Sequence, residues 1–117
     1  MARRGSRIMT NLAKKPPLGQ KTGRPKNGTA AGKAHMALVK QLPCVICGAS
    51  AVEVHHCRSN GTLRDDMKTI PLCFSDHRGP SGYHLNKAAW EAKYGPDTGF
   101  IAVTRHLVAT MEDDHGL

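Results

Sequence analysis

The feature that most constrains this chain is the crowding of metal-ligand side chains into one short stretch. All four cysteines and four of the seven histidines lie within residues 44–84. Cys44 and Cys47 are separated by two residues, a spacing that lets two thiolates on one tight turn reach the same metal ion. Cys73, from a later segment, can supply a third thiolate. The sequence therefore predicts a structural zinc site.

The fourth zinc ligand is left open by the sequence, because Asp76 and His77 both follow Cys73 closely. A metal is also what a chain of this composition needs. Only 4% of its 117 residues are aromatic, and a small domain with few large apolar residues usually requires a metal or disulfides. No apolar run follows the basic first residues, as a secretory signal would require, so a reducing compartment and metal binding are favoured over disulfides.

A redox site is a further alternative for the Cys-x-x-Cys pair. A thioredoxin-like site needs a strand before the motif and a long helix after it. Pro43 and Gly48 flank the cysteine pair and do not fit that arrangement.

No stretch approaches the roughly 20 apolar residues of a membrane span, so we expect no membrane association. The sequence suggests no small-molecule cofactor.

Charge is divided unevenly along the chain. Residues 1–40 contain ten Lys or Arg and no acidic residue, and residues 41–117 contain seven basic and nine acidic residues, for a net charge of +8. Residues 1–32 are rich in Gly, Pro and Lys and lack hydrophobic periodicity, so we expect a disordered basic arm. Such an arm suits contact with DNA phosphates, and Arg24 and Lys26 are candidate contacts. The alternative is a solvated tail that only aids solubility.

The remaining residues predict a small α+β domain over 33–111 and a frayed acidic tail over 112–117. Alternation of side chains along a strand places the adjacent His55 and His56 on opposite sides. Gly95 and Pro96 separate the last two expected helices. In order, we expect a helix over 34–42, a strand over 51–57, a polar loop over 58–68, a return strand over 69–72, a helix over 82–94 capped by Ser81, and a last helix capped by Asp97.

We also predict where four other side chains lie. Cys57 is expected to be a small core residue, and His35 to lie at the surface or to cap a helix. Leu85 and Trp90 are expected to pack toward the strands from the helix over 82–94.

The combined pattern resembles the HNH endonuclease family, and most of all its small phage and prophage members related to the Ref (recombination enhancement function) nuclease. The resemblance covers residues 34–108 and rests on LPCVICG, EVHHC, DDMKTIPLC, the histidines that follow, and WEAKYG. It implies a zinc-stapled ββα-metal (His-Me finger) domain with flanking helices. It also implies hydrolysis of DNA phosphodiester bonds in the cytoplasm of a bacterial host cell, linked to recombination or DNA processing, with a recombinase or phage DNA-processing machinery as partner.

The resemblance assigns roles residue by residue. Cys44, Cys47 and Cys73 match the structural zinc thiolates, and Asp76 stands where many members have a cysteine or histidine. The ligands of a catalytic divalent ion, which could be Mg²⁺, Mn²⁺, Ni²⁺ or Zn²⁺, are matched by His55, His77 and His84. His77 and His84 are seven residues apart, whereas relatives show about one helical turn.

His56 matches the general base of that family. An imidazole with the ordinary pKa of about 6.5 can take a proton from water at neutral pH. The middle Asn of the family is not evident, and the candidates for orienting His56 are Asn60, Asp65 and Asp66. Candidate phosphate contacts are Arg58, Arg64 and Lys87, which could also be solvated surface charges. The competing interpretation of the whole chain is a non-catalytic zinc-containing module that binds DNA.

Overall fold

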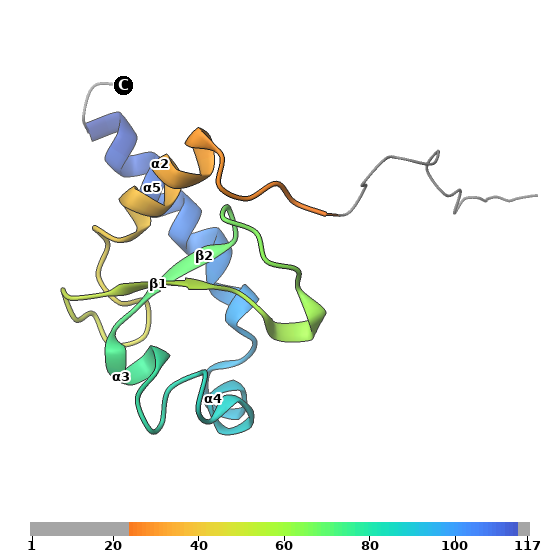
Figure 1. Ribbon diagram of the computed structural model, residues 1–117. Coiled ribbons are helices and arrows are strands. Elements are labelled where there is room, and N and C mark those ends of the chain that lie inside the picture. The colour runs from red at the N-terminus through yellow and green to blue at the C-terminus, as the bar shows by residue number, and fades with distance from the viewer. Residues whose placement is uncertain (1–23, 115–117) are drawn as a thin grey trace, which may run out of the picture.

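A short antiparallel sheet lies at the centre of the protein, with helices on both sides (Figure 1). The computed structural model describes residues 24–114; the arm residues 1–23 and the tail residues 115–117 lie outside the described part. Strand β1 (Glu53–His56) pairs with β2 (Thr69–Leu72) so that His55 stands opposite Ile70. The predicted α+β class is confirmed, and the return strand has the predicted bounds.

Two helices cover one side of the sheet. Helix α2 (Ala30–Val39) packs against α5 (Ile101–Asp114), and both contact β2. Helix α2 begins four residues earlier than predicted, because the Thr29 side chain accepts a hydrogen bond from the Gly32 N–H and caps the helix there. None of the helices within residues 24–114 combines the length and apolar character needed to cross a membrane.

The earlier start of α2 explains why one expectation was wrong. Gly32, His35 and Val39 share the buried face of this helix, so His35 is 8% exposed instead of lying at the surface. Val39 packs there with Leu42 and Val108 in the smaller of two buried clusters. Burial lowers the pKa of the His35 imidazole, which keeps it neutral within that packing.

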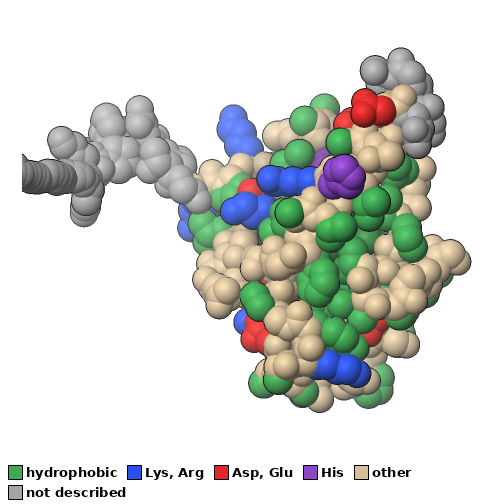
Figure 2. All heavy atoms as spheres, turned by 180° about the vertical axis from the view of Figure 1, so that it is seen from behind, with side chains coloured by type: hydrophobic (Ala, Val, Ile, Leu, Met, Phe, Trp, Pro, Cys, Tyr) green, Lys and Arg blue, Asp and Glu red, His purple; other side chains and the backbone are tan. Residues whose placement is uncertain are grey.

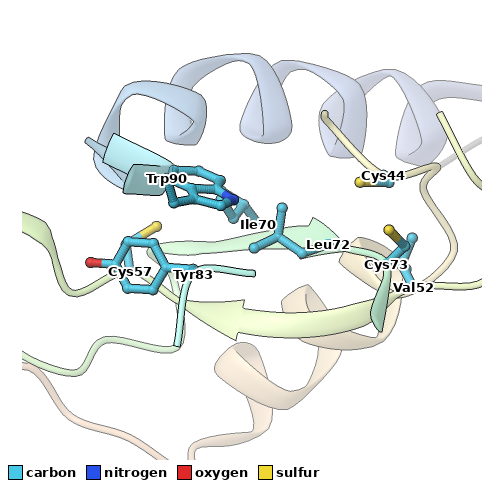
Figure 3. Packing of buried hydrophobic residues seen from close by; sticks show 8 residues of the cluster. All are labelled: Cys44, Val52, Cys57, Ile70, Leu72, Cys73, Tyr83 and Trp90. Atoms are coloured by element: carbon cyan, nitrogen blue, oxygen red, sulfur yellow. The ribbon is translucent and has the colours of Figure 1, made fainter. Parts of the chain in front are cut away.

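The larger buried cluster joins the sheet to α4 (Lys87–Tyr94) (Figure 3). Cys57 is 1% exposed, as predicted, and lies at the far end of this cluster from Cys44 and Cys73. Trp90 is buried as expected, but Leu85, which lies before the helix, is 69% exposed. The eight buried members are Cys44, Val52, Cys57, Ile70, Leu72, Cys73, Tyr83 and Trp90.

The chain between the sheet and α4 is folded back on itself instead of being helical. A single helical turn, α3 (Phe74–His77), is followed by turns, and the helix predicted over 82–94 begins only at Lys87. The Tyr83 N–H donates to the Asp76 carbonyl (2.9 Å) and the His84 N–H to the His77 carbonyl (3.0 Å). These bonds replace helical ones, so Asn86 and not Ser81 precedes α4, and His84 stands before the helix instead of on it.

Gly82 makes this return of the chain possible. A Cβ atom at Gly82 would lie 2.8 Å from the carbonyl carbon of His77 and 2.8 Å from the carbonyl oxygen of Ser75, closer than real side chains come. Only glycine allows two backbone segments to approach this closely. The turn therefore brings His84 beside His77 although seven residues separate them in sequence.

Candidate metal centre

The three predicted zinc thiolates and Asp76 meet at one end of the sheet. One ligand atom from each of Cys44, Cys47, Cys73 and Asp76 lies within 4.8 Å of the others. The Cys47 and Cys73 sulfurs are 3.6 Å apart, and the Asp76 Oδ2 is 3.4 Å from the Cys44 Sγ and 3.2 Å from the Cys73 Sγ. Tetrahedral ligands about 2.3 Å from a zinc ion would be separated by roughly 3.8 Å, so this set could hold a metal.

The turn that carries Cys44 and Cys47 is built by backbone hydrogen bonds. The Gly48 N–H donates to the Cys44 carbonyl (2.9 Å), and Gly48 has a left-handed φ of 80° that favours glycine. The Ile46 N–H points at the Cys44 sulfur (3.4 Å), as it would toward a thiolate. All four cysteines are free thiols, which does not support the disulfide alternative. Burial raises the pKa of Cys73 to about 12 without a metal, so its thiolate form needs a cation nearby.

Three histidines converge a short distance away. The nitrogens of His55, His77 and His84 offer ligand atoms within 4.8 Å of one another, and the Nε2 atoms of His77 and His84 are 3.1 Å apart. Burial lowers the pKa of each of these imidazoles, which favours the neutral form that binds metals. The structure thus places His77 with the histidines, and Asp76 with the thiolates.

The Nδ1 atom of His55 is the strongest sign that this second set fits a metal. His55 is fully buried, and its Nδ1 is among the few buried side-chain atoms of the described chain that have no hydrogen-bond partner. Leaving such an atom unsatisfied costs about 1–3 kcal/mol. A divalent ion bound by the three imidazoles would satisfy it.

Asp97 fixes which nitrogen of His55 is free. The His55 Nε2–H donates to the Asp97 carboxylate at 2.8 Å, which leaves Nδ1 unprotonated. Burial by itself would raise the pKa of Asp97, but hydrogen bonds from His55 and from the Arg58 and Ser59 amides outweigh it and lower that pKa. The prediction that Asp97 caps the last helix was wrong, because its carboxylate is used by these donors instead.

Glu53 orients His77 through a hydrogen bond, as Asp97 orients His55. Its Oε1 accepts a hydrogen bond from the His77 Nδ1 at 2.8 Å, so the His77 Nε2 faces His84. Hydrogen bonds from Arg78 and then from His77 lower the pKa of Glu53 to about 2, so it is ionised at neutral pH. Sequence reasoning missed Glu53, although it stands two residues before His55 and therefore on the same side of β1.

His56 lies beside this centre and contacts a different carboxylate. Its Nε2 is 2.8 Å from the Asp66 Oδ1, and its side chain is 17% exposed. Of the three residues expected to orient it, Asp66 does so; Asp65 instead accepts from the Met67 N–H and Asn60 adopts a left-handed turn conformation. A cavity of about 250 Å³ is lined by His56 together with Val54, Arg58, Arg64, His77 and His84.

The candidate phosphate contacts are distributed unevenly around this cavity. Arg58 and Arg64 line it, whereas the Lys87 ammonium lies 5.8 Å from the centre of the Tyr83 ring. Arg24 and Lys26 are exposed in the segment before α2. Lys and Arg side chains also gather near the point where the described chain begins, on the face seen from behind the view of Figure 1 (Figure 2).

The family described as "Protein of unknown function (DUF968)" matches residues 8–110, which includes both ligand sets. The chain belongs to the DUF968 family. No curated protein and no solved structure matches it.

Zinc content tests the cysteine set of this DUF968 protein. We expect the Cys47→Ser variant to lose its bound zinc and some stability, because a structural metal contributes folding free energy. Cys47 is exposed, so the substitution changes a ligand with little change in packing. Cys57→Ala is the matched control and should keep zinc, as measured by plasma mass spectrometry. Zinc retained by Cys47→Ser at the wild-type ratio would contradict the assignment.

The contribution of Asp97 can be measured as metal affinity. Replacing a carboxylate that orients a metal-binding histidine costs roughly 10–100-fold in affinity, so Asp97→Asn should weaken Ni²⁺ binding by that factor in isothermal titration calorimetry. Asp113→Asn, an exposed substitution on α5, should bind like the wild type. Equal affinities for all three proteins would show that Asp97 does not support a metal site.

Proposed function

We propose that this DUF968 chain is a metal-dependent endonuclease of the HNH (ββα-metal) type that hydrolyses phosphodiester bonds of DNA. The observation that carries the proposal is the convergence of His55, His77 and His84, two of which, His77 and His84, line one cavity with His56 and two arginines. A structural zinc needs only four ligands, and the cysteine set already provides them. A second set of neutral imidazoles with only three members leaves positions open for substrate.

The arrangement of elements supports the HNH assignment. The first histidine pair lies on β1, and the other two histidines follow the loop and the return strand β2, as in a ββα-metal unit; α4 follows the last histidine. One departure is that His84 precedes α4 instead of lying on it. The departure keeps the ligand atoms together, because the hydrogen bond between the His84 amide and the His77 carbonyl replaces the helical spacing.

The chemistry divides between the imidazoles that would hold an ion and the one that would accept a proton. His55, His77 and His84 would hold the divalent ion, with Mg²⁺, Mn²⁺, Ni²⁺ and Zn²⁺ as candidates. Such an ion, when bound, stabilises negative charge on a phosphate oxygen and on the leaving oxygen. Because the His56 Nε2–H donates to Asp66, its Nδ1 is the basic nitrogen that takes the proton of the attacking water.

Positive side chains would place the DNA backbone over the cavity. Arg58 and Arg64 line it, and a guanidinium group pairs well with a phosphate through two hydrogen bonds. The Asp66 carboxylate stabilises the imidazolium that forms when His56 is protonated, which keeps the base in place during the reaction. We further propose a role in DNA recombination or processing, with a recombinase or phage DNA-processing machinery as partner.

Plasmid nicking tests the proposal. With Mg²⁺, Mn²⁺ or Ni²⁺ the wild-type protein should nick supercoiled DNA, and His56→Ala should lower the rate by roughly 10²–10⁴-fold, the usual contribution of a general base. His106→Ala, an exposed histidine on α5, is the matched control and should retain the wild-type rate. Unchanged nicking by His56→Ala would remove the base assignment. Cleavage of no duplex, single-stranded or branched DNA would favour a non-catalytic DNA-binding module.

A further inference from the structure

The segment before α2 is attached to the loop that joins the two strands. The Asn27 side chain donates to the Arg64 carbonyl (3.1 Å) and accepts from the Asp66 N–H (2.8 Å). Asn27 is thus both a hydrogen-bond donor and an acceptor to a loop that is almost forty residues away in sequence. Asn27 and Gly28 fall within residues 1–32, which the sequence predicted to be a disordered arm; the structure gives these two residues defined partners.

Asp66 connects this segment to the proposed general base. Its Oδ2 accepts a hydrogen bond from the Gly28 N–H at 2.8 Å, and its Oδ1 pairs with the His56 Nε2 at 2.8 Å. Asp66 is only 2% exposed, so water competes little for either oxygen. The two oxygens of one carboxylate are therefore divided between the end of the arm and the base.

The backbone at Gly28 and Gly32 packs against the Asp66 side chain and fixes its position. Gly28 has a φ of +79°, a left-handed conformation that turns its N–H toward the carboxylate and that β-branched residues rarely adopt. A Cβ atom at Gly32 would lie 3.0 Å from both the Cβ and the Oδ2 of Asp66, so the first turn of α2 packs directly against it. The positive end of the α2 dipole also favours a carboxylate there.

We propose that Asn27 and Gly28 are positioning residues of the active site: they hold Asp66, and Asp66 holds His56. The same contacts fix the backbone of Arg64, whose side chain lines the cavity. The junction between the basic arm and the domain thereby supports two residues that line the cavity, His56 and Arg64. This inference rests on the proposed nuclease function for its catalytic consequence, but the coupling between Gly28 and His56 can be measured without activity.

Four variants of the full-length chain distinguish loss of the contacts that position Asp66 from loss of a nearby positive charge. Asn27→Ala removes the side chain that holds the loop, and this side chain is exposed, so its loss leaves the core unchanged. Gly28→Val opposes the left-handed conformation, whereas Gly28→Asn tolerates it and keeps the N–H. Lys26→Ala removes a neighbouring exposed charge and leaves the contacts to Asp66 in place.

Steady-state nicking kinetics give the first readout. Asn27→Ala and Gly28→Val should lower kcat about tenfold, part of the roughly 10²–10⁴-fold that a general base supplies, with KM changed by less than about twofold. Gly28→Asn should keep the wild-type kcat. Lys26→Ala should raise KM and weaken the salt dependence without changing kcat, because it removes a candidate phosphate contact. An unchanged kcat for Asn27→Ala, or equal losses for Gly28→Val and Gly28→Asn, would overturn the inference.

The nitrogen chemical shifts of the His56 ring give the second readout. In long-range ¹H–¹⁵N spectra assigned with His56→Ala, the His56 signals should move in Asn27→Ala while those of His106 stay in place. If no DNA is cleaved and the His56 signals move, the nuclease proposal fails and the coupling stands. Nicking activity with unmoved His56 signals would instead reject the coupling. If Gly28→Val does not fold, Asn27→Ala decides between these outcomes.

Discussion

The buried contact between Asp97 and His55 is the interaction on which the rest of the candidate site depends. Asp97 is fully buried and accepts hydrogen bonds from the His55 ring and from the amides of Arg58 and Ser59. One carboxylate therefore joins the end of β1, the loop that follows it and the segment leading into α5. A buried charge is tolerated only when donors surround it, and these donors also set the free nitrogen of His55.

The two ligand sets are physically linked through α3. Asp76 and His77 are adjacent on this single turn, yet the Asp76 side chain lies with the cysteines and the His77 side chain with the histidines. The carbonyls of both residues then hold the amides of Tyr83 and His84. A metal bound by the cysteines would brace the turn that positions two of the three histidines, so it would prepare the proposed catalytic site.

Residue types and spacing predicted which side chains could be ligands, but not how they are supported. The return strand, the cysteine set and the buried Cys57 followed from local pattern. The role of Asp97 did not, because its partner His55 is 42 residues away and nothing local distinguishes this use from a helix cap. The predictions for Leu85 and His84 were wrong for a related reason. The amides of Tyr83 and His84 donate to the carbonyls of Asp76 and His77, and these bonds interrupt a segment whose sequence predicts a helix.

Anomalous diffraction from a crystal soaked in Mn²⁺ tests most directly whether three imidazoles hold a second ion. Data collected at the manganese and zinc absorption edges distinguish the two metals. We expect a manganese peak in contact with the Nδ1 of His55 and the Nε2 atoms of His77 and His84, and a separate zinc peak among Cys44, Cys47, Cys73 and Asp76. Zinc at the cysteines with no metal at the histidines would contradict this expectation.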